Sequence, residues 1–231
     1  MRPPPQPLPR SVRSKIAGLA VAIGVFGLSF GVLAVTAGLS PLVACAMSLL
    51  VLAGGSQFAA VGVVAAGGSP VAAVVSGALL NTRFVPFGLA LAPLLEGGLL
   101  RRAVASHILV DESAALAIAE GRHGRASPDR VFWLTGITVL VTWNVGTALG
   151  AFAGGLIGDP EALGLDVAFP AGFLALLAPL LDTRRARVSA LAGVAIAIVL
   201  VPTAPPGVPV LAATLGAALA LLVPEDAGGT R

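Results

Sequence analysis

Long apolar stretches, separated by short polar or basic loops, run through almost the whole chain. Most of them approach the ~17–25 residues that a membrane-spanning helix takes. They cover residues 16–36, 42–66, 71–95, 104–119, 131–157, 167–181, 188–201 and 208–223. The pattern predicts an all-α fold, a polytopic transmembrane helix bundle of about seven to eight apolar segments with broken or re-entrant helices.

The fourth apolar segment, residues 104–119, differs from the others. It is short and carries His107, Asp111 and Glu112. It is compatible with a tilted short span, a re-entrant segment or an interfacial helix.

Composition supports a membrane protein. The chain is 57% hydrophobic and 11% charged, whereas soluble domains are about 25% charged. We expect a basic, proline-rich cytoplasmic arm at 1–15, a transmembrane transporter domain at 16–223 and a short tail at 224–231.

The single cysteine excludes an intrachain disulfide and a paired-cysteine metal site. No cofactor, metal or nucleic acid is predicted, and the bilayer is the expected surroundings.

Basic residues predict the topology, because cytoplasmic loops collect arginine and lysine. The clusters at 10–15, 122–130 and 184–187 are expected to be cytoplasmic. Both termini are then predicted to lie on the cytoplasmic side of a bacterial inner membrane. An even number of crossings must then separate the first two clusters, either four or two plus re-entrant segments. Arg101 and Arg102 would lie outside with four crossings, which keeps the re-entrant option open.

A polar interruption breaks the second apolar segment at Gly54, Gly55, Ser56 and Gln57. Adjacent glycines weaken a helix, and unwound backbone at membrane depth is tolerated where it lines a cavity. Its carbonyls and helix termini suit the charged ends of a zwitterion. The alternative is a close helix crossing through small residues.

Asn81 and Arg83 lie within the third apolar segment. A central arginine costs about 2.5–3.5 kcal/mol on the insertion scale and is a functional candidate by default. Pro86 would loosen the helix there. The alternative is two shorter segments with residues 81–84 in a turn.

At a spacing of four, His107 and Asp111 are expected to share a helix face, and Glu112 to point about 100° away. These groups are candidates for binding and releasing a proton during transport; the alternative is a solvated cytoplasmic helix. Asn144, beside Trp143 in the middle of a segment, is a candidate for substrate contact or for interhelical hydrogen bonding.

Two pairs of weakly similar segments suggest an internal sequence repeat. AGLSPLVACAMSLLVLA from Ala37 is similar to LGLDVAFPAGFLALLAP from Leu163, and LLNTR at 79–83 is similar to LLDTR at 180–184. Repeated halves are typical of secondary transporters, although such matches also arise by chance in sequence rich in alanine and leucine.

Enzymatic function is not predicted. The chain has no phosphate-binding G-x-x-x-x-G-K-[ST] loop and no H-E-x-x-H motif. GGSQF with His107 downstream raises an intramembrane serine protease as a minor alternative, but no glycine completes the G-x-S-x-G elbow.

Several motifs in order resemble the AzlC family, the large subunits of branched-chain amino acid exporters: LAGGSQFAA, LLNTRFVPFGLALAPLL, HILVDESAALAI and NVGTALGAFAGGLIGDP. The resemblance implies an inner-membrane permease that works with a small AzlD-type membrane subunit and exports valine, leucine, isoleucine or related amino acids. It places family polar positions at Ser56, Gln57, Asn81, Arg83, Asp111 and Glu112. In the family the arginine is often followed by histidine, where this chain has Phe84.

These observations give the working hypothesis of a proton-coupled secondary transporter for apolar amino acids. The helix break near Gly54 and Arg83 would contact the substrate carboxylate, and Asp111 or Glu112 would face the ammonium or carry the proton. The competing class is a channel or a non-transport membrane scaffold that assembles through small-residue helix faces.

Overall fold

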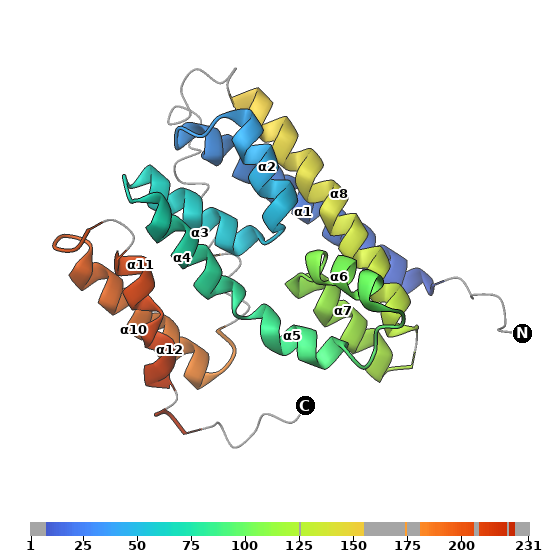
Figure 1. Ribbon diagram of the computed structural model, residues 1–231. Coiled ribbons are helices and arrows are strands. Elements are labelled where there is room, and N and C mark those ends of the chain that lie inside the picture. Colours follow the sequence, from blue (N-terminus) through green and yellow to red (C-terminus); the bar gives the residue numbers. More distant parts are fainter. Residues whose placement is uncertain are drawn as a thin grey trace, which may run out of the picture.

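The computed structural model describes residues 8–124, 126–154, 174, 181–205, 208–220 and 222–224, and the regular elements within these ranges are all helices (Figure 1). They are α1 (Arg10–Thr36), α2 (Pro41–Val51), α3 (Gly54–Ala65), α4 (Pro70–Asn81), α5 (Phe84–Leu91), α6 (Leu99–His107), α7 (Asp111–Arg122), α8 (Pro128–Gly154), α10 (Arg184–Leu200), α11 (Val208–Ala213) and α12 (Leu215–Ala220). The predicted all-α class is confirmed for this part of the chain. Helix α1 begins at Arg10, so the last residues of the predicted arm are helical.

Within the described part of the chain, three helical stretches are long and apolar enough to cross a membrane. They are α1 with 27 residues, α8 with 27 residues, and α4 and α5 taken together over Pro70–Leu91 with 22 residues. The remaining described helices are shorter. The predicted number of seven to eight segments is not tested, because residues 155–173 and 175–180 lie outside the described residues.

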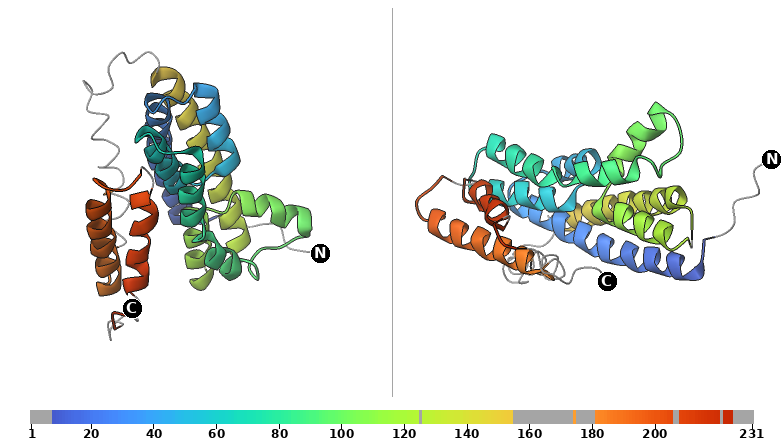
Figure 2. Two further views of the ribbon diagram at one scale, coloured as in Figure 1. Left: turned by 60° about the vertical axis from the view of Figure 1, so that its left-hand side comes forward. Right: turned by 90° about the horizontal axis from the view of Figure 1, so that it is seen from below.

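Helices α1 and α8 run parallel and pack closely along their lengths (Figures 1 and 2). Gly27 lies against the backbone of Trp143, and Gly31 lies against the backbone of Thr147 and Gly150. A Cβ atom at Gly27 would lie 2.5 Å from the carbonyl oxygen of Trp143. Only glycine permits backbones to approach this closely, as is common where membrane helices meet. The small residues of both helices are therefore used in this contact.

Helices α2 and α3 form a hairpin at the end of the molecule where α1 terminates. Ser40 caps α2 with its side-chain oxygen, and Pro41 takes the first helical position. Both features favour the start of a helix. The hairpin turns at Leu52, whose φ of 27° is left-handed. Helix α3 then runs back to the end of α1, where Gly62 of α3 and Thr36 of α1 line the same hollow. The predicted break is confirmed, but it lies at residues 52–53, and residues 54–57 form the first turn of α3.

Helices α6 and α7 form a second hairpin at the opposite end of α1 and α8. At the start of α6, the guanidinium of Arg101 lies 2.8 Å from the carboxylate of Asp129. At the end of α7, the ammonium of Lys15 lies 2.7 Å from the carboxylate of Glu120. Both helices therefore begin or end at the N-terminal ends of α1 and α8. The hairpin enters and leaves on one side, as a re-entrant segment does.

The turn between α6 and α7 contradicts one prediction. His107 is the last residue of α6 and Asp111 is the first of α7, so the two side chains do not share one helix face. The Ser113 hydroxyl accepts a hydrogen bond from the Val110 N–H at 3.0 Å and lies 3.1 Å from the Ile108 carbonyl. Because this hydroxyl satisfies backbone groups at the turn, α7 can begin there without a preceding helical turn.

The third apolar segment is interrupted between α4 and α5. Thr82 and Arg83 keep right-handed backbone angles, so the interruption is a kink within one span. Pro86 has no N–H to donate to Thr82, whose carbonyl accepts from Val85 N–H at 3.1 Å. Proline thus accounts for the altered hydrogen bonding. The predicted alternative is right about a turn near residues 81–84, but α4 and α5 together remain one candidate span.

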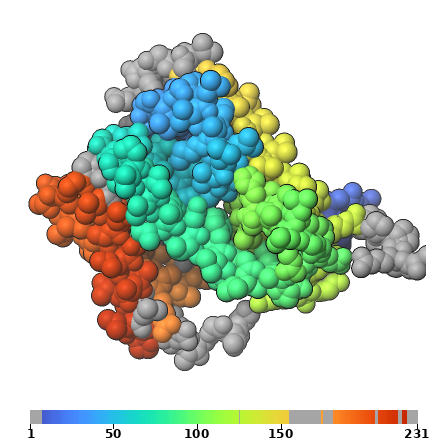
Figure 3. All heavy atoms as spheres, viewed as in Figure 1, coloured from blue at the N-terminus to red at the C-terminus, as the bar shows by residue number. Residues whose placement is uncertain are grey.

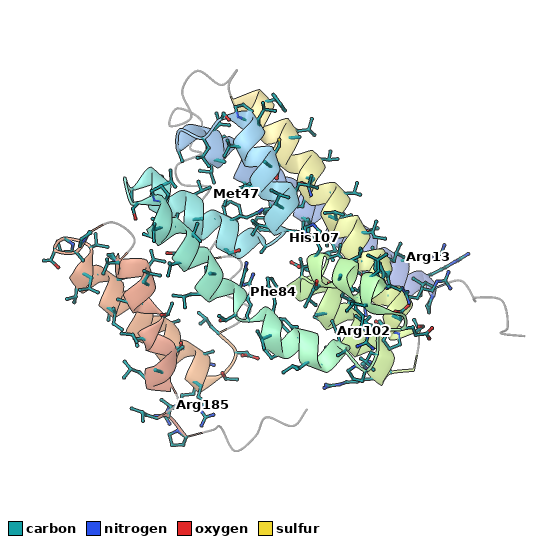
Figure 4. All side chains as sticks on the ribbon, in the orientation of Figure 1. Arg13, Met47, Phe84, Arg102, His107 and Arg185 are labelled. Atoms are coloured by element: carbon teal, nitrogen blue, oxygen red, sulfur yellow. The ribbon has the colours of Figure 1, made fainter. Side chains whose placement is uncertain are left out.

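Arg13 and Arg102 lie at the same end of the molecule (Figure 4). The basic residues of α1, α6 and α7 therefore share one side, and α1 and the α4–α5 stretch are the candidate crossings between residues 15 and 122. This arrangement agrees with the predicted option of two crossings plus re-entrant segments, in which Arg101 and Arg102 lie on the same side as the other basic clusters. Which side is cytoplasmic stays a prediction.

Helices α10, α11 and α12 pack together beside α4 (Figure 1). The Arg185 Nε atom donates a hydrogen bond to the carbonyl of Val223 at 2.7 Å. This bond ties the start of α10 to the residues that follow α12. The second half of the predicted repeat begins at Leu163 and lies largely outside the described residues. The repeat stays a prediction.

Candidate functional site

A cavity of about 250 Å³ lies midway along α1 and α8, where the three helix breaks meet. Its wall includes Leu52 to Gly55 from the α2–α3 break, Arg83 and Phe84 from the α4–α5 kink, and Val110 to Glu112 from the α6–α7 turn. Figure 3 shows α2 to α7 covering α1 from this side, so the tips of both hairpins meet in front of the long helices. A cavity lined by backbone breaks at membrane depth is where a substrate site is expected.

An ion pair spans the cavity. The Arg83 Nη2 atom lies 3.2 Å from the Asp111 Oδ2 atom, and both side chains keep more than a third of their surface exposed. Arg83 also lies over its neighbour Phe84, with 5.1 Å from Cζ to the ring centroid. Arg83 Nε and Asp111 Oδ1 have no hydrogen-bond partner within the described residues. Each charged group therefore has one buried polar atom whose hydrogen-bonding capacity no described residue uses.

Two carboxylic acids begin α7 at the cavity wall, outside the three candidate spans. Burial raises the pKa of Asp111, and the positive charge of Arg83 offsets this only in part. Burial raises the pKa of Glu112, and the nearby Asp111 carboxylate adds to the increase against the backbone hydrogen bond and Arg83. Desolvation penalises the charged form of an acid, so both groups hold protons to higher pH than a free side chain does.

The first turn of α3 faces the same cavity. Ala53 precedes the helix and provides no side-chain cap. The Gln57 N–H donates a hydrogen bond to the Ala53 carbonyl at 3.0 Å, which closes the first turn. Because the first N–H groups of a helix lack intrahelical acceptors and carry a partial positive charge, they favour an anion. Leu52 precedes them in a left-handed conformation that costs a non-glycine residue about 1–3 kcal/mol. This strained turn directs the α3 start toward Arg83.

The opposite wall is apolar and aromatic. Trp143 stacks on Phe30 at 5.7 Å between centroids and meets Phe58 edge to face at 6.0 Å. Ile23 and Val139 complete this wall from α1 and α8. The cavity thus joins a charged side to an apolar side, as a ligand with a charged head and an apolar body requires.

The predicted site residues divide into two groups. The cavity wall contains Gly54, Gly55, Arg83, Asp111 and Glu112. The others lie outside it, and their roles stay predictions: they are Ser56, Gln57, Asn81, His107 and Asn144.

Contacts of two members of the outer group indicate structural roles. Gln57 is fully buried and donates from Nε2 to the Met47 carbonyl at 2.9 Å, which ties α3 to α2. Asn144 accepts from the Ser48 hydroxyl at 2.9 Å, joining α8 to α2. This bond matches the alternative of interhelical hydrogen bonding.

Asn81 and His107 border the helix breaks. Asn81 ends α4, two residues before Arg83, and its Oδ1 atom has no partner among the described residues. His107 is exposed at the end of α6.

Sequence reasoning missed the aromatic wall, above all Trp143. The signal was present, because tryptophan in membrane proteins concentrates at the interfaces, and Trp143 lies in the middle of a long apolar segment. Phe58 gave no comparable signal, since a phenylalanine in an apolar helix is ordinary.

The helices and this cavity together define a polytopic α-helical membrane protein with charged side chains around a central cavity. The family model described as AzlC protein matches residues 18–157, more than half of the chain, and the protein belongs to the AzlC family. The matched range contains the whole cavity wall. Family membership indicates a membrane transport-related role and confirms the resemblance predicted from the motifs. No curated protein and no solved structure matches the chain.

Proposed function

We propose that the protein is an inner-membrane permease that exports branched-chain or other apolar amino acids by proton-coupled secondary transport, together with a small AzlD-like subunit. AzlC membership supports a role in transport. The more specific proposal draws on the chemistry of the cavity, where opposite charges face an apolar wall.

The observation that carries the proposal is the Arg83–Asp111 ion pair inside the cavity. An amino acid zwitterion inserted between them would give its carboxylate to Arg83 and the start of α3, and its ammonium to Asp111. One ion pair is exchanged for two, so both charged groups keep an ionic partner while the ligand is bound. A ligand with a single charge would leave one of the two groups without its ionic partner, so it is expected to bind more weakly than a zwitterion. The aliphatic side chain would lie against Trp143 and its neighbours.

Proton coupling is assigned to the two acids of α7. The pKa values of Asp111 and Glu112 are raised by burial, so a proton can bind and leave nearer to neutral pH than at a free carboxyl. Glu112 is the stronger candidate for the proton, because Asp111 is engaged with Arg83. His107 lies outside the cavity and is not needed for this step.

The scaffold and protease alternatives receive less support. A scaffold would use small-residue helix faces for assembly, but Gly27 and Gly31 of α1 already pack against α8 within this chain. The protease alternative needs Ser56 beside a base. The Ser56 hydroxyl instead donates to the Ala53 carbonyl at 2.8 Å and is buried, while His107 is exposed on another hairpin. We therefore propose a transport role without enzymatic activity.

A counterflow assay tests the proposal. Membrane vesicles that contain the full chain and its small partner subunit are loaded with unlabelled leucine, and the entry of labelled leucine is followed. We expect saturable counterflow that valine and isoleucine suppress and that glutamate does not. Vesicles with the partner alone serve as the control. Equal flux in both preparations would refute the proposal, and flux without discrimination among amino acids would favour a channel.

A further inference from the structure

Gly54 and Gly55 are consecutive residues in the first turn of α3, and both line the cavity. Successive residues of a helix point about 100° apart. The two positions therefore face different parts of the cavity wall, although they are neighbours in the sequence. The atoms that a Cβ would meet at each glycine show which part of the cavity wall depends on the absence of a side chain there.

A Cβ atom at Gly54 would lie 3.0 Å from Cη2 of Trp143 and 3.3 Å from Cζ3 of the same ring. Both distances are tighter than ordinary van der Waals contact. The indole ring is itself held by Phe30 and Phe58. Because the ring also lines the cavity, its displacement away from α3 would change the space that the cavity offers to a ligand.

A Cβ atom at Gly55 would lie 3.3 Å from Nη2 and 3.4 Å from Nη1 of Arg83. The guanidinium lies at the far end of a flexible side chain, so it can move by a few tenths of an ångström. Such a movement displaces it from the position that faces Asp111, 3.2 Å away. Gly55 thus controls the charged side of the cavity, and Gly54 controls its apolar side.

Resting on the proposed function, we infer that Gly54, with Trp143, determines which substrate side chain the cavity accepts, while Gly55 is a positioning residue for Arg83. The absence of a Cβ at Gly54 lets the indole lie back against α3 and leaves room for an aliphatic chain. The absence of a Cβ at Gly55 lets the guanidinium approach the start of α3, where the substrate carboxylate binds. Side-chain selection and carboxylate binding are thereby separated onto neighbouring residues.

The two positions predict different substitution effects. In Gly54→Ala the added methyl group and the displaced indole shorten the apolar subsite, so leucine loses more affinity than alanine. Because one methylene in an apolar pocket changes discrimination by about 10- to 200-fold, we expect the preference for leucine over alanine to fall by about fivefold or more. In Gly55→Ala the affinities for all substrates fall by a common factor, because every amino acid presents the same carboxylate.

The test measures the concentrations of alanine, leucine and phenylalanine that halve the counterflow of labelled leucine in vesicles with the full chain and its partner. Gly54→Ala is expected to lower the preference for leucine over alanine, and Trp143→Phe to raise the acceptance of phenylalanine. Combining Gly54→Ala with Trp143→Phe should restore the preference toward the wild-type value. Gly55→Ala should weaken all three competitors equally. Gly18→Ala is the matched control, because no atom lies within 4 Å of a Cβ there.

The outcomes separate this inference from the proposed function. Wild-type vesicles without any leucine-specific counterflow would overturn both. Wild-type counterflow with unchanged competitor preferences in Gly54→Ala and in Trp143→Phe would overturn the assignment of the side-chain subsite alone. If Gly54→Ala does not reach the membrane, Trp143→Phe decides, because it enlarges the same subsite without adding an atom to α3. A changed preference in Gly55→Ala would overturn the separation of the two roles.

Discussion

The Arg83 guanidinium lies 3.2 Å from the Asp111 carboxylate, although the two residues come from different helix breaks and are far apart in the sequence. Both also line the cavity that the hairpin tips enclose. This pair supplies one positive and one negative group at the spacing of a direct ion pair. The account of function depends on the exchange of this pair for contacts with a zwitterion.

Loss of the Asp111 charge should weaken substrate binding. In Asp111→Asn the substrate ammonium loses its ionic partner, and contacts to charged groups contribute about 1.5–3 kcal/mol. We therefore expect the half-saturating leucine concentration to rise by roughly 10- to 100-fold in counterflow measurements. Asp182→Asn is the control, because Asp182 is exposed and lies outside the cavity. Similar saturation of the two variants would argue against an ammonium site at Asp111.

The Glu112 carboxyl should make stability depend on pH. Its pKa is raised in the folded protein, so the folded state holds the proton to higher pH than the unfolded chain does. The corresponding stabilisation is present at low pH and is lost as pH rises through the folded pKa. Thermal unfolding in detergent should show a midpoint that falls over this range in the wild type, with a smaller decrease in Glu112→Gln. An identical pH profile for both proteins would contradict the burial of this carboxyl.

Close packing of α1 on α8 should make Gly31 intolerant of a side chain. A Cβ there would collide with the backbone of Thr147 and Gly150, and overpacking costs about 1–3 kcal/mol. Gly31→Ala should lower the thermal unfolding midpoint, while Gly18→Ala, which meets open space on the same helix, should not. Equal midpoints for the two variants would show that the helices are farther apart than described.

Lys15 should stabilise the end of α7. The Glu120 carboxylate is almost fully buried and lies 2.7 Å from the half-exposed ammonium of Lys15. A carboxylate in the last turn of a helix is also opposed by the helix dipole. Removal of the partner in Lys15→Ala should cost on the order of 1–3 kcal/mol, measured by thermal unfolding at neutral pH. Lys15→Arg keeps the charge and should retain most stability; a loss as large as in Lys15→Ala would contradict a charge-based role.

Much of the helical content follows from local sequence. Ser40–Pro41 and Ser69–Pro70 each supply a capping hydroxyl and a proline at the helix start, and the apolar runs specify helices because a membrane leaves no water to bond the backbone. The glycine pair and Pro86 indicated where helices would be interrupted. These signals act over one or two turns, and they were sufficient to place two of the three breaks to within a few residues.

The spatial relationships could not be read in the same way. His107 and Asp111 were expected on one face because four residues separate them, but Ser113 stabilises a turn at Val110 and divides the helix. The pairing of Arg83 with Asp111 depends on how two hairpins from opposite ends meet. That arrangement arises from packing between distant segments, which local patterns do not encode.

Equilibrium binding of labelled leucine to the purified full chain, together with the proposed small partner subunit, tests the central claim most directly. The account predicts saturable binding in the wild type and in Arg102→Ala, whose exposed side chain lies on α6 outside the cavity. It predicts a loss of at least about tenfold in affinity for Arg83→Ala. In the wild type, 4-methylpentanoate and 3-methylbutylamine, which keep one charge each, should compete poorly. Undiminished binding in a folded Arg83→Ala protein would contradict the account.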